Sequence, residues 1–416
     1  MTSERKSGKI RPFLSRRGFI GTASLGVAGL SSGVPLGARV LPPSALAALE
    51  STNLWDLPTP ALVVDVDALE HNLDKMAAFY KDRPVGLRPH GKTHKCPDLA
   101  KMQLERGAIG VCAAKVSEAE VMLDAGIADI LITSPVVTKE KIDRVIALAK
   151  RSGGVWMVID QKKNAHDFNA AAEAAGITLR VLIDLNVGTD RTGITMGEPT
   201  LALAKTIAGL GSLKLVGVQA YAGHLQHIPG WEYRRQRSLS TMGEAVALAE
   251  SLRREGHDIQ VITGGGTGTY NIDCDVEGVT DMQVGSYLFM DGDYRRIGGK
   301  DSSIFDDFQP ALFVLATAIS QPVPGRITLD AGYKAMATDK GMPDVRNIEG
   351  VSYRWGGDEH GILQLTNPSR PIELGDKMLL MATHCDPTVN LHDSLVAFRG
   401  ERIEAVWPVA GRGRSQ

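Results

Sequence analysis

The sequence predicts an α/β protein in which a (β/α)8 barrel is followed by a C-terminal antiparallel β domain. Two observations favour this fold class. Eight short apolar runs alternate with amphipathic stretches between residues 85 and 287, and the alternation stops near residue 305. Apolar strands separated by helices are typical of a parallel sheet that is covered on both faces, and eight such units fit a barrel. A doubly wound open sheet is the structural alternative.

The barrel elements are predicted in chain order. A strand, TPALVVDVDAL (59–69), is followed by a helix, EHNLDKMAAFYK (70–81). The eight apolar runs are VGLRPHGK (85–92), AIGVCAA (108–114), DILITS (129–134), VWMVID (155–160), LRVLIDL (179–185), LVGVQAY (215–221), IQVITGG (259–265) and MQVGSY (282–287). Helices such as 115–126 and 241–256 end in glycine, the usual helix stop. We therefore place the barrel at residues 71–304.

The C-terminal part is predicted to be a β domain over residues 305–411. Its strand-like segments are ALFVLATAIS, RITLDAGYKAM, GILQL and KMLLMAT, with turn residues between them. The net charge of −2 argues against a nucleic-acid surface, which needs a dense basic patch. The four cysteines are widely spaced and form no CxxC pair, so neither a zinc ribbon nor a disulfide scaffold is indicated.

The first 47 residues resemble a twin-arginine export signal. Paired arginines in SRRGFIG (15–21) precede a weakly apolar stretch that is rich in small residues, and ALA (45–47) has the form of a cleavage site. We therefore expect residues 1–47 to be removed and the folded protein to act in the periplasm, without a membrane anchor. A disordered basic tail is the alternative.

Polar residues concentrate at the carboxyl ends of the predicted strands, where barrels carry their chemistry. They are His90, Lys92 and His94; Asp190 and Arg191; Tyr221, His224 and His227; the segment TGGGTGTY (263–270); and Gly285, Ser286 and Tyr287. The glycine-rich segment follows the seventh strand and a second glycine follows the eighth, which is where barrels favour phosphate sites. The spacing matches neither a Walker A nor a Rossmann motif, which argues against ATP and NAD.

Lys92 lies at the end of the first strand, and we expect it to form a Schiff base. Burial would lower its pKa, so that a neutral amine can attack an aldehyde. An aldehyde cofactor that carries a phosphate is pyridoxal 5′-phosphate (PLP). The alternative is a surface lysine that pairs with a carboxylate.

Five motifs then resemble one family. RPHGKTHK, NVGTDRTG, YAGHLQH, GGGTGTY and HCDPTVNLHD together resemble the D-threonine aldolase and D-serine dehydratase family, over about residues 55–411. These are PLP enzymes of the alanine-racemase-like fold. The resemblance implies a PLP barrel and a β domain that takes up the N-terminal strand, here within residues 56–70. It also implies a homodimer, and Asp358, Glu359 and His360 could then reach the active site from a partner subunit.

The resemblance also implies roles for single residues. Lys92 would bind PLP and move the Cα proton, Arg191 would approach the ring oxygen, and Tyr221 would contact cofactor or substrate. The phosphate would be held by Gly265, Gly266, Thr267, Gly285 and Tyr287. We favour His227 as the base that takes the proton of the substrate hydroxyl, with His224 left open. The alternative is that either histidine bonds a backbone carbonyl.

The triplet His384–Cys385–Asp386 follows an apolar strand, and its spacing suggests a metal site. On a strand, residues i and i+2 share a face, so we expect His384 and Asp386 to point together and Cys385 to point away. One imidazole and one carboxylate, completed by water or substrate, suit Mn²⁺ or Zn²⁺. In the family that the chain resembles, aldolases tend to carry His-x-Asp and dehydratases His-x-Cys.

These features predict a PLP- and metal-dependent lyase. It would cleave a D-3-hydroxy amino acid such as D-threonine to glycine and an aldehyde. The alternatives are a dehydratase or aldolase acting on D-serine or 3-hydroxy-D-aspartate, and a PLP-binding protein without turnover. The substrate side chain stays open, and Arg88 and Arg354 are the candidates for binding a second carboxylate.

Overall fold

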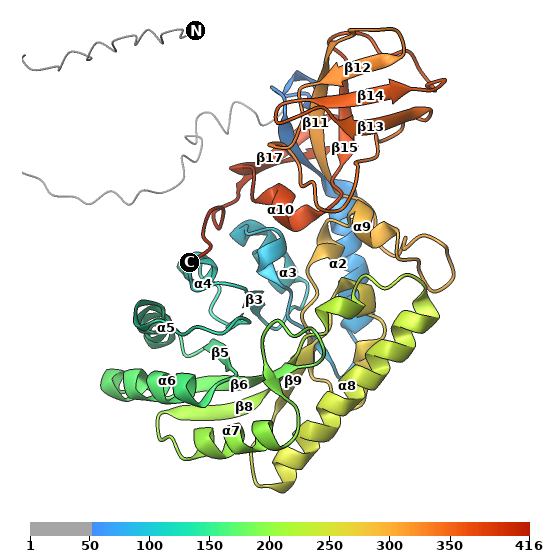
Figure 1. Cartoon of the computed structure of the whole chain (residues 1–416). Coiled ribbons are helices and arrows are strands. Elements are labelled where there is room, and N and C mark those ends of the chain that lie inside the picture. The colour runs from blue at the N-terminus through green and yellow to red at the C-terminus, as the bar shows by residue number, and fades with distance from the viewer. Residues whose placement is uncertain (1–51) are drawn as a thin grey trace, which may run out of the picture. The chain divides into compact units, whose positions relative to one another are not determined.

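The computed structural model describes residues 52–416, so the predicted export signal lies outside the described residues and stays a prediction. Among residues 52–416, no helix combines the length and the apolar character that crossing a membrane requires. The described chain consists of a parallel barrel with helices around it and a mostly antiparallel β domain (Figure 1).

The barrel is built from eight parallel strands in the spatial order β2-β10-β9-β8-β6-β5-β4-β3. They are β2 (Gly86–Leu87), β3 (Val111–Ala113), β4 (Ile130–Ile132), β5 (Val155–Ile159), β6 (Leu179–Asn186), β8 (Leu213–Ala220), β9 (Val261–Gly264) and β10 (Asp281–Met282). The short β7 (Ile194–Thr195) adds to the end of β6. The amide of Cys112 bonds the carbonyl of Pro89 at 2.8 Å, and that of Ile109 bonds the carbonyl of Leu87 at 2.8 Å. These bonds join the two ends of the sheet, so the predicted barrel is confirmed.

The first and last barrel strands are shorter than predicted. After β2 the chain enters a 3-10 turn, η2 (Gly91–Thr93), and after β10 it enters another, η6 (Ser286–Leu288). The ring of His90 accepts a bond from the amide of Lys92 at 3.4 Å, which ends the extended backbone there. Side-chain capping of this kind competes with strand pairing, and apolar patterning does not reveal it.

Helices separate most of the barrel strands. They are α2 (Val66–Tyr80), α3 (Pro97–Glu105), α4 (Val116–Asp124), α5 (Lys139–Arg151), α6 (Lys162–Ala175), α7 (Glu198–Ala208), α8 (Trp231–Arg254) and, after β10, α9 (Gly292–Arg295). Between β9 and β10 stand two 3-10 turns, η4 (Thr267–Thr269) and η5 (Asp273–Asp275). Helix α8 begins at Trp231 rather than at 241, because residues 231–240 are polar on one face and bury Arg234 and Ser238 on the other.

Apolar side chains fill the inside of the barrel, and an ion pair closes one end. Cys112, Leu131, Val158 and Leu182, from successive strands, belong to one buried cluster. Arg88 is buried and pairs with Asp281 at 2.8 Å and with Asp129. Its guanidinium also lies over the ring of Trp156, 4.4 Å from the centroid. Because these partners occupy Arg88, the suggestion that it binds a substrate carboxylate is wrong.

The β domain is one mixed sheet. Its strands are β1 (Ala61–Asp65), β11 (Leu312–Ser320), β12 (Arg326–Leu329), β13 (Val351–Trp355), β14 (Gly361–Leu365), β15 (Lys377–Met381), β16 (Ser394–Arg399) and β17 (Arg402–Pro408). Strand β1 pairs antiparallel with β11 and parallel with β16, which places the N-terminal strand in this sheet. The predicted strand 59–69 was too long. The carboxylate of Asp65 accepts a bond from the amide of Ala68 at 3.3 Å and starts α2.

Candidate active site

A cavity of about 550 Å³ opens at the carboxyl ends of the barrel strands. Its lining includes His90, Lys92, Ala114, Lys115, Thr133, Ser134, Pro135, Val137, Asp160, Arg191, Thr192, Gln219, Tyr221 and Gln283. Three of the predicted cofactor residues, Lys92, Arg191 and Tyr221, therefore meet in one place. The guanidinium of Arg191 lies over the ring of Tyr221, 5.2 Å from its centroid.

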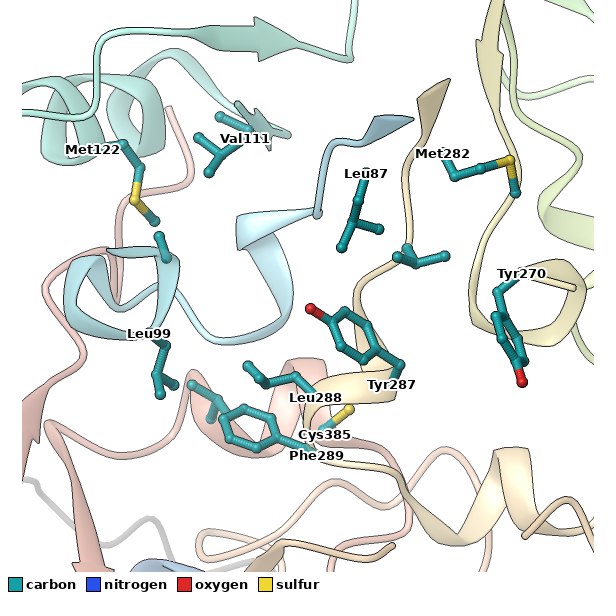
Figure 2. Packing of buried hydrophobic residues seen from close by; sticks show 14 of the residues in the cluster. Leu87, Leu99, Val111, Met122, Tyr270, Met282, Tyr287, Leu288, Phe289 and Cys385 are labelled. Carbon is teal, nitrogen blue, oxygen red and sulfur yellow. The ribbon is translucent and has the colours of Figure 1, made fainter. Parts of the chain in front are cut away.

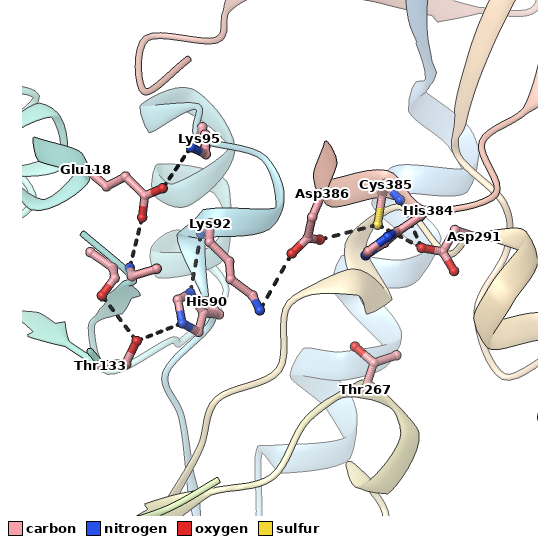
Figure 3. A network of polar contacts seen from close by, with 12 residues as sticks. His90, Lys92, Lys95, Glu118, Thr133, Thr267, Asp291, His384, Cys385 and Asp386 are labelled. Atoms are coloured by element: carbon pink, nitrogen blue, oxygen red, sulfur yellow. Dashed lines mark hydrogen bonds and ion pairs between the residues drawn. The ribbon is translucent and has the colours of Figure 1, made fainter. Parts of the chain in front are cut away.

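Lys92 extends from the turn η2 toward the β domain, where its Nζ lies 3.7 Å from Oδ2 of Asp386 (Figure 3). Its side chain keeps 37% of its surface exposed. The expectation of a lowered pKa is wrong for this lysine. Burial does disfavour the ammonium form, but the charges of Asp386 and Tyr221 outweigh it and raise the pKa of Lys92.

Two neutral histidines flank Lys92. The Nε2 atom of His90 lies 3.0 Å from the hydroxyl of Thr133, and the ring of His94 accepts a bond from the amide of Cys96 at 3.1 Å. Burial and the nearby cations lower the pKa of His90 well below its usual value. Burial also lowers the pKa of His94 to about 4. Both rings are therefore uncharged at neutral pH and add no positive charge beside Lys92.

This buried pair predicts a loss of stability in mild acid. An unfolded histidine titrates near pH 6.5, while the folded pKa of His94 is about 4, so the unfolded chain binds more protons between these values. The stability due to neutral His94 is complete above pH 6.5 and is lost as the pH falls toward 4. Between pH 7 and pH 5, we expect the unfolding free energy of the H94Q variant to fall by about 2 kcal/mol less than that of the wild type. Urea denaturation of the cofactor-free proteins measures this, and equal losses would contradict it.

The loops after β9 and β10 form a cradle that fits a phosphate. Within residues 52–416, the amides of Gly266 and Thr267 have no hydrogen-bond acceptor. A Cβ atom on Gly266 would lie 2.6 Å from Oε1 of Gln226, and one on Gly285 would lie 2.5 Å from Oγ1 of Thr93. That hydroxyl of Thr93 is buried and lacks a partner among the described residues. Free amides and a free hydroxyl beside glycine backbone are donors that a phosphate accepts.

The conformation of these loops accounts for the glycine at position 265. It also places the phenol of Tyr287 away from the cavity. Gly265 has a φ of 66°, a conformation that other residues adopt at a cost in free energy. The amide of Tyr287 donates to Oγ1 of Thr267 at 3.0 Å and so ties the two loops together. The phenol of Tyr287 does not reach the cavity, because it is buried and accepts a bond from Gln103 at 3.0 Å. Figure 2 shows its ring among apolar core side chains.

The two histidines of the loop after β8 lie apart from the cavity lining. His224 is exposed on the turn η3 (Gly223–Leu225), and partial burial and Arg237 lower its pKa. His227 packs on Tyr294 with ring centroids 4.4 Å apart. Its Nδ1 lies 2.8 Å from Oδ2 of Asp293, a contact that is short but not aligned as a hydrogen bond.

Asp293 joins His227 to the β domain. Its Oδ2 atom also lies 3.0 Å from Nζ of Lys340. Burial by itself would raise the pKa of Asp293, but the contacts with His227 and Lys340 lower it to about 2. Asp293 is therefore anionic at neutral pH. The Asp293 carboxylate faces Nδ1 of His227, and Nε2 is the ring nitrogen that remains for another partner.

The triplet 384–386 is not a strand, as the spacing argument assumed. Strand β15 ends at Met381, and Cys385–Val389 form the short helix α10 with His384 as its N-cap (Figure 3). The sulfur of Cys385 is buried 3.2 Å from Oδ2 of Asp291, whereas Asp386 faces Lys92. Asp291, from a distant part of the chain, accepts the amide of Cys385 at 3.0 Å and so satisfies a free amide in the first turn of this helix.

The donor set of this segment fits a divalent ion with two protein ligands. Nδ1 of His384 lies 2.7 Å from Oδ2 of Asp339, which leaves Nε2 for a metal. Asp386 supplies a carboxylate, and water or substrate would complete the coordination. Within residues 52–416 there is no group of three or more His, Cys, Asp and Glu side chains placed to hold a metal. An ion held by His384 and Asp386 would therefore need water or substrate as its remaining ligands.

Residues 64–293 match the family model of the alanine racemase N-terminal domain. The chain belongs to this family. Residues 311–398 match the model of a serine dehydratase domain. The alanine racemase family is PLP-dependent, in agreement with the cradle and with the position of Lys92.

Two relatives and one solved structure match this chain over most of its length. The chain is 38% identical to a D-threonine aldolase of Arthrobacter, over 86% of this chain and 93% of the relative. It is 36% identical to a 3-hydroxy-D-aspartate aldolase of Paracoccus denitrificans, over 89% and 96%. The crystal structure of D-threonine aldolase from Filomicrobium marinum superposes with a TM-score of 0.84 at 37% identity, covering 88% of this chain and 99% of that one.

Metal use also occurs among these relatives. A D-threo-3-hydroxyaspartate dehydratase variant, 27% identical and with a TM-score of 0.78 over 86% of this chain and 98% of that one, has been solved in a metal-free form. The relatives with aldolase names act on small D-3-hydroxy amino acids.

Four residues that were predicted as candidates for the active site lie away from the cavity in this alanine racemase-type fold. Asp358, Glu359 and His360 are exposed in the turn between β13 and β14, where Glu359 pairs with Lys334 at 2.5 Å. Arg354 is exposed on β13. None of these four lines the cavity. Their arrival from a partner subunit stays a prediction, as does the homodimer.

Several other residues of the site were not predicted from the sequence. Thr133, Gln219 and Gln283 line the cavity, while Asp291, Asp293 and Asp339 hold candidate functional side chains. Thr133 stands at the end of a predicted strand and could have been found there. The three aspartates act through residues distant in the chain, so no local pattern marks them.

Proposed function

We propose that the protein is a PLP- and divalent-metal-dependent lyase that cleaves D-3-hydroxy amino acids to glycine and an aldehyde. One observation carries the proposal: Nζ of Lys92, a residue that lines the cavity, lies 3.7 Å from the carboxylate of Asp386. A cofactor lysine and a candidate metal ligand that are this close can act on one small substrate. The similarity to the D-threonine and 3-hydroxy-D-aspartate aldolases supports this reaction class.

PLP, when bound, withdraws electrons from the bonds at Cα of an amino acid, and a divalent ion stabilises negative charge on an oxygen atom. The residues of the chain supply the remaining functions. The free amides of Gly266 and Thr267, with the hydroxyl of Thr93, would bind the phosphate. Arg191 and Tyr221, which follow the neighbouring strands β6 and β8, would orient the ring. Asp386, which faces Lys92, and His384 would hold the ion.

Two side chains are suited to move protons. Nζ of Lys92 can hold or return the proton at Cα of the glycine product, since it reaches into the cavity. His227 would accept the proton of the substrate hydroxyl at Nε2, because Asp293 faces its Nδ1 atom. Loss of that proton allows the oxygen to form a carbonyl while the bond between Cα and Cβ breaks. His224 is exposed and forms no ion pair with a carboxylate among residues 52–416, so it is less suited to this role.

Product analysis with two substrates tests the proposal. The mature protein, with PLP and Mn²⁺, is incubated separately with D-threonine and with 3-hydroxy-D-aspartate. We expect glycine plus acetaldehyde from the first, or glycine plus glyoxylate from the second, and the faster reaction identifies the preferred side chain. A 2-oxo acid plus ammonia would instead establish a dehydratase. No product from either substrate or from D-serine, with PLP bound, would favour a non-catalytic PLP-binding protein. L-Threonine serves as the stereochemical control.

A further inference from the structure

We propose that Arg234 is a positioning residue that locks the phosphate cradle to the loop carrying His227. Here the phosphate loop means residues 265–269, and the sixth loop means residues 221–230. The part of the inference that concerns His227 rests on the proposed function, whereas the part that concerns the phosphate loop does not.

Arg234 lies in the first turns of α8 and is completely buried. In the part of the chain that the structure describes, its guanidinium donates only to backbone carbonyls. Nε bonds Gly268 at 2.8 Å in the phosphate loop, and Nη1 bonds Ile228 at 2.7 Å in the sixth loop. Nη1 and Nη2 also bond Ile297 at 3.2 Å and Gly298 at 2.8 Å, just after α9. One side chain thus joins three segments that are far apart in the sequence.

Arg234 has no charged partner among the described residues, which indicates that its role is to position the backbone. Among residues 52–416, no carboxylate forms an ion pair with Arg234. Burial lowers its pKa, and the more distant Asp307 opposes this only in part. Burying a guanidinium without an anion costs free energy unless its donors are satisfied. An apolar residue would fill the same volume without this penalty, so what Arg234 adds is the set of four directed bonds.

These bonds fix both backbone groups of Gly268. Its carbonyl is held by Arg234, and its amide donates to Oε1 of Gln226, in the sixth loop, at 3.1 Å. Gln226 in turn donates to Oγ1 of Thr269 at 3.0 Å. The phosphate loop is therefore tied to the sixth loop from two sides. The amides of Gly266 and Thr267 remain free of protein acceptors within the described chain.

The same contacts position the candidate base. Ile228, whose carbonyl Arg234 holds, directly follows His227. Ile297 and Gly298 follow α9, the helix that contains Asp293, the partner of His227. Arg234 thus stabilises both the segment of the histidine and the segment of its aspartate. Losing it should loosen the phosphate site and the base together, although Arg234 touches neither cofactor nor substrate.

The test compares R234K and R234M with R235K and R235M. Arg235 is the next residue on the same helix and is exposed, so its variants control for changes in helix composition. Dissociation constants of PLP and of pyridoxal, which lacks the phosphate, are measured on cofactor-free protein by absorbance titration. We expect R234K to bind PLP about tenfold more weakly, because a lysine cannot form a planar set of four bonds. Binding of pyridoxal should change by less than about twofold.

Turnover at saturating PLP gives the second readout. We expect kcat of R234K to fall with little change in KM, because the base and not the substrate pocket is displaced. An unaltered PLP affinity in folded R234K, or an equal loss for PLP and pyridoxal, would overturn the positioning role. If R234K binds PLP about tenfold more weakly but keeps the kcat of the wild type, only the link to His227 would be overturned. Since PLP binding needs no turnover, failure of the proposed reaction leaves the first test intact.

Hydrogen exchange on the unmodified protein covers the case in which the Arg234 variants do not fold. We expect inorganic phosphate, added to cofactor-free protein, to slow amide exchange in both the phosphate loop and the sixth loop. Slowing in the phosphate loop alone would show that the two loops are not coupled and would overturn the proposal.

Discussion

Replacement of Lys92 by alanine is expected to abolish the visible absorbance of bound PLP and to lower turnover by about 10⁴-fold. Two lysines of the described chain, Lys92 and Lys115, line the cavity, and Lys92 lies beside the candidate metal ligand Asp386 and the neutral His90. Its amine is the group that an aldehyde would meet there. Truncation removes both the covalent attachment and the proton carrier, so the two losses should appear together.

The measurement is an absorbance spectrum of the PLP-treated protein, followed by borohydride reduction and peptide mapping. The K101A variant is the matched control, because Lys101 is exposed on α3 and lies outside the cavity. K101A should keep the absorbance and the reduced label on the peptide of Lys92. A label on a different lysine of the wild type, or on K92A, would refute the assignment of Lys92.

Replacement of Asp386 by asparagine is expected to lower Mn²⁺ affinity by at least about a hundredfold and turnover by a similar factor. The substitution keeps the shape of the side chain but removes the anionic oxygen that would bind the ion. Because His384 and its partner Asp339 remain, we expect excess Mn²⁺ to restore part of the activity.

Metal affinity is measured by titrating chelator-treated protein with Mn²⁺ and following free Mn²⁺ by electron paramagnetic resonance. This readout is independent of turnover. The D358N variant is the control, since Asp358 is exposed in the turn after β13 and lies outside the cavity. Unchanged affinity and activity in D386N, with activity that also survives chelation, would exclude a metal role for this segment.

The barrel and the cavity residues could be predicted because they follow a simple physical pattern. Strands buried on both faces are continuously apolar, and their carboxyl ends meet at one rim, so Lys92, Arg191 and Tyr221 could be brought together from their places in the sequence. The tertiary contacts could not be predicted in this way. The helix α10 depends on Asp291, and the burial of Arg234 depends on carbonyls from three other segments.

The same limit explains two wrong expectations, one about the pKa of Lys92 and one about the backbone conformation of residues 384–386. The raised pKa of Lys92 comes from the charge of Asp386. Asp386 belongs to the β domain, so no pattern within the barrel sequence marks it as a neighbour of Lys92. His384 and Asp386 do not lie on a strand for a similar reason. The helix starts where a distant carboxylate accepts a backbone amide, so the spacing of the triplet did not reveal its backbone conformation.

The closure of the barrel has a consequence for the order of folding. The segment that carries Lys92 pairs on one side with β10, near the end of the barrel sequence, and on the other side with β3. Pairing of chain segments so remote from each other is slow, since a long loop must close first. Docking of β10 is therefore the step that completes the surroundings of Lys92. We expect a barrel that lacks β10 to leave the segment of Lys92 unpaired on that side and unable to bind PLP.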